Sequence, residues 1–146
     1  MSKLSHFDPA GQPRMVDVSE KGATRRTARA HAFVRMSRQV LDALPDNPKG
    51  DPLAVARVAG VMAAKRTAEL IPLCHPLGLD HVEVKFRVGR AAIEIICTAE
   101  TSAQTGVEME ALTGVSVAAL ALYDMCKAVD KTMRIEGIRV VKKVKE

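Results

Sequence analysis

Aromatic side chains are scarce in this sequence. The chain of 146 residues has one tyrosine, three phenylalanines and no tryptophan. Proteins that hold single-stranded nucleic acid stack its bases on aromatic rings. RNA-binding sheet domains carry an aromatic strand motif of the K/R-G-F/Y-G/A-F type, and this sequence lacks it. We therefore expect no nucleic-acid partner.

Cysteine is also sparse, and its spacing indicates neither disulfides nor zinc. Cys74, Cys97 and Cys126 are odd in number and form no CxxC pair, and no second ligand pair has zinc-type spacing. No hydrophobic signal segment opens the sequence. The longest apolar tract, residues 115–122, is well short of the roughly 20 residues that a membrane-spanning helix needs. These absences predict a reduced, cytoplasmic protein with no metal site and no membrane partner.

Positive charge is what the sequence has in excess. It contains 22 lysines and arginines against 17 aspartates and glutamates, which gives a net charge of +5 and a pI near 9.3. A basic surplus favours an anionic partner. Because the aromatic platforms for nucleic acid are missing, a small phosphorylated ligand fits best, although neither a P-loop nor a GxGxxG motif is present.

The length fits one domain. Residues 1–14 contain two prolines and a glycine with little periodicity, and are predicted to form a flexible N-terminal arm before a single domain over residues 15–146. Apolar alternation predicts strands over residues 26–36, 81–88 and 91–100, and one strand or a strand pair over 132–145. Helical spacing and breakers predict helices over residues 37–44, 52–70 and 105 to about 129. This order is typical of an α+β, ferredoxin-like split βαβ fold, an antiparallel sheet with helices packed on one face.

The segment "LIPLCHPL" presents the first candidate for chemistry. Pro72 and Pro76 restrict the backbone on both sides of Cys74 and His75, so the imidazole is held on a stiff loop. The alternative is a partly buried histidine at a helix-to-strand turn, with Cys74 a small buried hydrophobe. In an extended loop the two adjacent side chains point to opposite sides, which argues against a shared metal.

Carboxylates on the long C-terminal helix form the second candidate. Thr105 and Glu108 fit a capping box, which explains Glu108 without any function. Glu110 and Asp124 are 14 residues apart and share a helical face, so they can line the floor of a cleft. Asp124 and Lys127 have the (i, i+3) spacing of a surface ion pair. Carboxylates beside a lysine also perturb one another's pKa, as acids and bases in enzymes do.

Basic residues form the third candidate. Lys49 lies in the proline-broken loop "PDNPKGDP", Lys65 near the end of a helix, and Lys143 in the last strand. Each alone is explained as a solvated surface charge. Together with Lys127 they can assemble a site for a polyanion.

Three stretches resemble one known family. "MVDVS", "KGDPLAVARVAGVMAAKRTAELIPLCHPL" and "TGVEMEALTGVSVAALALYDMCKAV" are similar to the cyclic pyranopterin monophosphate synthases, the molybdenum cofactor biosynthesis protein C family. The resemblance covers residues 15–143. It implies rearrangement of 3′,8-cyclo-7,8-dihydroguanosine 5′-triphosphate into cyclic pyranopterin monophosphate with release of pyrophosphate, which is the chemistry of a phosphorus-oxygen lyase.

The resemblance also implies a site and an assembly. Asp124, Lys127 and Lys49 are expected to be catalytic, and the residues expected to bind substrate are His75, Cys74, Glu108, Met109, Glu110, Lys65, Arg26 and Lys143. No cofactor is expected, although a divalent metal such as magnesium is compatible with a triphosphate. The expected assembly is a hexamer made of three dimers, with the active site at the dimer interface. The competing interpretation is a non-catalytic module that senses a ligand.

Overall fold

The computed structural model describes residues 4–146, and its centre is one antiparallel sheet. The four strands are ordered β2-β3-β1-β4, and all three pairings are antiparallel. The strands are β1 (Thr24–Arg35), β2 (Leu79–Val88), β3 (Ala92–Ala103) and β4 (Arg134–Lys145). The two central strands are therefore β1 and β3, and each is followed in the sequence by a helical connection.

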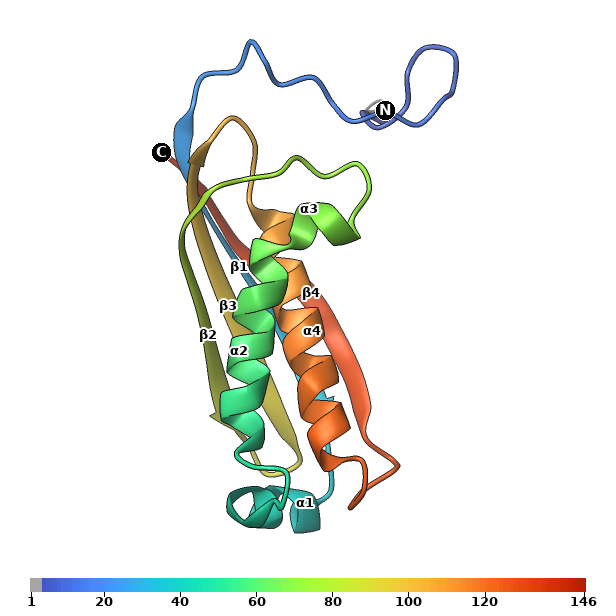
Figure 1. The fold of residues 1–146 in the computed structure, drawn as a ribbon, viewed down its shortest axis with the longest axis vertical. Coiled ribbons are helices and arrows are strands. Elements are labelled where there is room, and N and C mark those ends of the chain that lie inside the picture. The colour runs from blue at the N-terminus through green and yellow to red at the C-terminus, as the bar shows by residue number, and fades with distance from the viewer. Residues whose placement is uncertain (1–3) are drawn as a thin grey trace.

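Two long helices cover one face of this sheet (Figure 1). The helical segments are α1 (Arg38–Ala43), the 3₁₀ turn η1 (Leu44–Asp46), α2 (Pro52–Lys65), α3 (Thr67–Leu70) and α4 (Glu108–Cys126). α2 and α4 lie side by side along the long axis of the molecule, as Figure 1 shows. The order of elements and strands confirms the predicted α+β, ferredoxin-like split βαβ fold.

Residue size explains how closely the helices approach the sheet. The helix-facing positions of β1 are Ala28, Ala30, Ala32 and Val34, all fully buried, and those of β3 include Ile93 and Ile95. Small side chains on β1 let α4 lie close to the strand, while the larger ones on β3 fill the space below both helices. The core therefore occupies the single layer between helices and sheet.

Glycines set the crossing of the two helices. A Cβ atom at Gly60 of α2 would lie 3.0 Å from the carbonyl oxygen of Gly114, and one at Gly114 of α4 would lie 2.6 Å from Cys97 Sγ. Cys97 is wholly buried on β3, and burial raises the pKa of its thiol to about 12. This cysteine therefore acts as a small apolar filler beneath the crossing.

Two local expectations need correction. α4 begins at Glu108, and its N-cap residue, Val107, forms no side-chain capping hydrogen bond. The predicted capping box between Thr105 and Glu108 is therefore wrong. The predicted helix over 52–70 is interrupted at Arg66, which ends α2 and precedes the short α3. The C-terminal segment, predicted as one strand or a strand pair, is one strand, β4. Each difference concerns an end or a break, where local hydrogen bonding decides the structure.

α4 is long and apolar enough to cross a membrane by length and composition, the one such helix among the described residues. More than half of its apolar window is buried within this domain. It packs against α2 and the sheet, as the core helix of a globular domain does.

Candidate functional site

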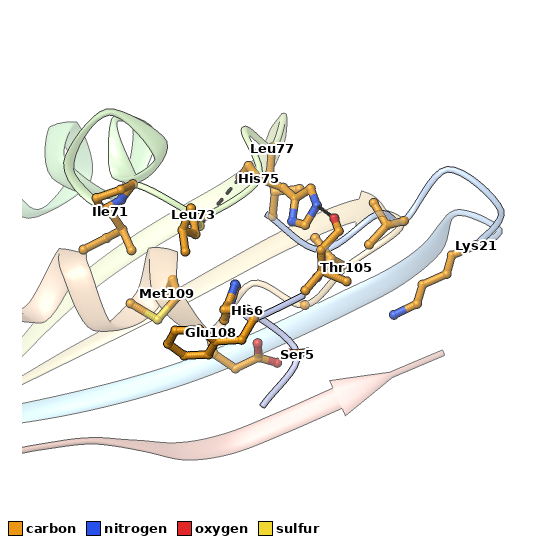
Figure 2. Close-up of a pocket in the computed structure, with 16 residues that line it drawn as sticks. Ser5, His6, Lys21, Ile71, Leu73, His75, Leu77, Thr105, Glu108 and Met109 are labelled. Carbon is orange, nitrogen blue, oxygen red and sulfur yellow. Dashed lines mark hydrogen bonds between the residues drawn. The ribbon is translucent and has the colours of Figure 1, made fainter. Parts of the chain in front are cut away.

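The loop between α3 and β2 connects Cys74 and His75 to different partners. The Cys74 thiol donates to Glu110 Oε2 at 3.8 Å. The imidazole of His75 is hydrogen-bonded through Nε2 to the carbonyl oxygen of Val16, which lies before β1 (Figure 2). The two neighbouring side chains therefore have different partners, although both line one cavity. His75 is partly buried. Partial burial is compatible with both interpretations, a functional histidine on a stiff loop and a structural histidine at a helix-to-strand turn.

Glu110 is a buried acid at the start of α4. It is 3% exposed, and its Oε1 atom has no hydrogen-bond partner among the described residues. Burial raises the pKa of Glu110. The pKa of Cys74 is raised to about 11, by burial first and then by the Glu110 carboxyl beside it. A carboxyl oxygen without a partner in such a position can bind a polar ligand group.

Glu108 and Met109 occupy the first turn of α4. The Glu108 carboxylate folds back over Gly106, where no side chain obstructs it, and forms an ion pair with Lys143 at 3.2 Å. Met109 is 37% exposed, and both residues line a cavity of about 660 Å³ together with Cys74 and His75. The start of a helix also favours negative charge.

Arg26 and Lys65 lie at the border of the same region. Arg26 donates to the carbonyl oxygen of Gln104 at 3.5 Å, while its Nε atom is buried without a partner among the described residues. Lys65 ends α2 and lines a small cavity of about 130 Å³ that Glu110 also lines. We call the residues around loop 71–78 and the start of α4 the upper cluster: Arg26, Lys65, Cys74, His75, Glu108, Met109, Glu110 and Lys143.

The remaining three predicted residues meet at the other end of α4. Lys127 Nζ is 3.0 Å from Asp124 Oδ1, which confirms the expected (i, i+3) ion pair. Lys49 Nζ donates to the backbone carbonyl of Asp124 at 3.4 Å. The pKa of Asp124 is lowered by Lys127 first and by Lys49 after it. We call Lys49, Asp124 and Lys127 the lower cluster.

Residues that the sequence analysis did not single out hold Lys49 there. Asn47 donates from Nδ2 to the carbonyl oxygen of Met125 and accepts the Lys49 amide through Oδ1, both at 2.8 Å. Gly50 has φ +113, a conformation that favours glycine. Asp51 then caps α2 by accepting the amides of Leu53 and Ala54. Asn and Gly in a proline-rich loop were the only sequence signal of this arrangement.

One chain does not bring the two clusters together. Fourteen residues of α4 separate Glu110 from Asp124, which at 1.5 Å per residue is about 21 Å. In Figure 1 the loop that follows α3 lies near the start of α4, whereas the segment around α1 lies near its other end. We expected Glu110 and Asp124 to line the floor of one cleft along α4. In the structure Glu110 is buried at one end of the helix and Asp124 is exposed at the other.

The cavity of about 660 Å³ has walls that the sequence analysis did not foresee. Figure 2 shows Ser5, His6 and Lys21 from the N-terminal segment facing it, opposite Ile71 and Leu73 of the loop. No sequence pattern links residues so far apart. Between residues 4 and 146, no three His, Cys, Asp or Glu side chains are grouped closely enough to hold a metal ion.

Comparison with known proteins identifies the family. A family model described as the MoaC family matches residues 15–145. The chain belongs to the MoaC family. It is 58% identical to the cyclic pyranopterin monophosphate synthase of Chloroflexus aggregans, over 98% of this chain and 89% of that protein. The cyclic pyranopterin monophosphate synthase of Novosphingobium aromaticivorans is 55% identical, over 98% of this chain and 92% of that protein. A cyclic pyranopterin monophosphate synthase 2 from Mycobacterium bovis is 57% identical over 97% and 86%.

Proposed function

We propose that this protein is a cyclic pyranopterin monophosphate synthase of molybdenum cofactor biosynthesis, and that it acts in the cytoplasm. The observation that carries the proposal is the similarity over nearly the whole chain to relatives with that name. The reaction is the conversion of 3′,8-cyclo-7,8-dihydroguanosine 5′-triphosphate into cyclic pyranopterin monophosphate and pyrophosphate. This assigns the protein to the phosphorus-oxygen lyases.

The lower cluster suits the phosphate end of this substrate. Lys127 Nζ pairs with the Asp124 carboxylate, and Lys49 Nζ donates to the backbone carbonyl of the same residue, so one residue holds two exposed ammonium groups. Asp124, whose pKa is lowered by these lysines, is ionised at neutral pH and orients Lys127. In this proposal the lysines neutralise phosphate charge and transfer protons during ring opening and cyclisation.

The upper cluster suits the end of the substrate that derives from the guanine base. Glu108, which lines the large cavity, offers a carboxylate to the N–H groups of a guanine-type ring. Glu110, whose buried Oε1 atom has no hydrogen-bond partner among the described residues, borders the small cavity that Lys65 also lines. The apolar walls of the large cavity, which include Leu73 and Met109, suit the faces of such a ring. His75 stands at the edge of this cavity, where it can orient the substrate or transfer a proton.

A second copy of the chain is needed to unite these two ends. The gap of about 21 Å between the clusters is too long for contacts to the same reacting atoms from one subunit. Two copies related by a two-fold axis across α4 would place the lower cluster of one beside the upper cluster of the other. The outer face of the helix layer supports such packing, because Val58, Met62 and Leu120 are 58%, 45% and 59% exposed. We propose that three such dimers form a hexamer.

The proposed reaction needs no resident cofactor. Proton transfers and phosphate displacement can be carried out by lysines and carboxylates alone. A divalent ion such as magnesium would instead arrive with the substrate, because triphosphate oxygens are ligands that it prefers.

The test is direct incubation with the cyclised triphosphate. Pyrophosphate is measured by a coupled assay and the pterin product by fluorescence after oxidation, each with and without magnesium. An Asp124→Asn variant serves as the matched control, because it removes one negative charge with little change of shape. Equal yields of both products that depend on Asp124 would support the proposal. Tight binding of substrate that is recovered unchanged under every condition would favour the ligand-sensing module.

A further inference from the structure

The segment just before β1 lies against the His75 loop. Residues 16–19, which we call the strap, alternate in exposure: Val16 and Val18 are half-buried, whereas Asp17 and Ser19 are exposed. Val18 lines two cavities that His75 also lines. In Figure 1 the N-terminal segment passes the end of the helix layer where loop 71–78 is found. The strap is therefore a wall of the upper cluster.

One hydrogen bond connects the strap to the imidazole. His75 Nε2 bonds the carbonyl oxygen of Val16 (Figure 2). A carbonyl oxygen can only accept, so Nε2 must carry the proton. In the neutral ring, Nδ1 then has the lone pair, and within residues 4–146 it forms no hydrogen bond of its own. The strap thus occupies one ring nitrogen and leaves the other for a ligand.

Local hydrogen bonds fix the shape of the strap. Asp17 Oδ1 accepts the Ser19 amide at 2.9 Å, and the Lys21 amide donates to the Val18 carbonyl at 3.0 Å. The pKa of Asp17 is lowered mainly by its hydrogen bonds with Ser19, and to a smaller degree by the charge of His75.

We propose that the strap is a positioning element of the active site, which fixes His75 as the Nε2–H tautomer and presents Nδ1 to the substrate. The presentation to substrate rests on the proposed function, whereas the tautomer does not. The opposite tautomer would set the Nε2 lone pair against the lone pairs of the Val16 carbonyl. When Nδ1 accepts a proton from the substrate, the Nε2–H bond to Val16 is kept, and the carbonyl dipole faces the positively charged ring.

The first measurement is on the unmodified chain. Imidazoles of the ¹⁵N-histidine-labelled protein are observed by long-range ¹H–¹⁵N correlation at about pH 8, where a free imidazole is neutral. The His75 signals are assigned by their loss in His75→Gln. A single Nε2–H pattern for His75 is expected. An Nδ1–H pattern, or the averaged pattern of a ring that exchanges between tautomers, would overturn the proposal whether or not the protein turns over the cyclised triphosphate.

The second measurement distinguishes a strap that positions His75 from a strap that is only a wall of the cavity. Val18→Asp places a charge on the buried side of the strap, and Met15→Asp places the same charge on an adjacent exposed side chain. We expect Val18→Asp to lose the single tautomer pattern and to reduce kcat by on the order of 10- to 10²-fold, with a smaller change in KM. Met15→Asp should retain the single tautomer pattern and the wild-type kcat. An unchanged tautomer in Val18→Asp, a loss confined to KM, or equal damage by Met15→Asp would contradict the positioning role.

Discussion

Gly106 provides the space into which the Glu108 carboxylate folds. A Cβ atom at position 106 would lie 2.3 Å from Glu108 Oε1 and 2.5 Å from Oε2. Ordinary van der Waals contact begins at 3.4 Å, so a Gly106→Ala variant must displace the carboxylate by at least about 1.1 Å, the difference between 3.4 and 2.3 Å. The φ angle of Gly106 is not positive, so the backbone itself accepts alanine.

The displaced group is the end of a flexible side chain, so the fold should tolerate this substitution. The stability at risk is that of the partly exposed Glu108–Lys143 ion pair, worth about 0.2–1 kcal/mol. Turnover should suffer more, because a shift of about 1 Å in a substrate-contacting group can reduce the rate by up to about 10²-fold. We therefore expect an enzyme with near-normal stability and much lower activity.

The assay compares Gly106→Ala with Gly78→Ala. A Cβ atom at Gly78 would meet nothing within 4 Å, so this control makes the same chemical change without moving a carboxylate. Denaturant unfolding gives the stability of each variant, and pyrophosphate release gives its turnover. Wild-type turnover by Gly106→Ala would refute the role of Glu108. A loss of stability above about 2 kcal/mol would instead refute the steric reasoning.

Three further predictions concern other parts of the chain. Lys49→Arg and Lys127→Arg should bind substrate but lose about 10²- to 10⁴-fold in turnover, because arginine keeps the charge but cannot act as a base; near-normal turnover in both would leave the lysines as phosphate contacts only. Leu120→Asp should split the oligomer in light scattering and abolish activity, whereas an active wild-type-sized particle would exclude this face as the interface. Asp130 has its pKa lowered to about 2, chiefly by hydrogen bonds with Thr132 and then with the Ser37 amide. Its stabilisation is therefore complete above its ordinary pKa of 3.8 and is lost as the pH falls from 3.8 towards 2. Asp130→Asn should flatten the pH dependence of the unfolding free energy in this window, and an unchanged slope would contradict the assignment.

Much of the fold was predictable because burial follows simple periods in this sequence. The alternation of Ala28, Ala30 and Ala32 fixes which side of β1 meets the helices, and Pro52 and Pro72 limit the helical region between them. Helix ends were less predictable, because the Glu108 carboxylate folds over Gly106 and does not complete the expected cap. The break at Arg66 likewise has no sequence signal as strong as proline or glycine.

The candidate site was predictable in composition and less so in space. The ion pair of Asp124 and Lys127 follows from helical spacing alone. Helical phase also places Glu110 and Asp124 on one face, but phase does not measure the distance along the axis, which separates the two clusters. The contact of the strap with His75 joins positions 59 residues apart, and no local pattern encodes such a pairing.

The shared site is the central claim, and subunit complementation tests it most directly. His75→Ala damages the upper cluster and Lys127→Ala the lower one, so each homodimer should be inactive with the cyclised triphosphate. Co-expression of the two variants gives mixed dimers in which one of the two sites contains neither substitution. For random pairing we predict recovery of about one quarter of wild-type pyrophosphate release, since half of the dimers are mixed and half of their sites are intact. Mixed oligomers as inactive as the two parents would contradict a site built from both subunits.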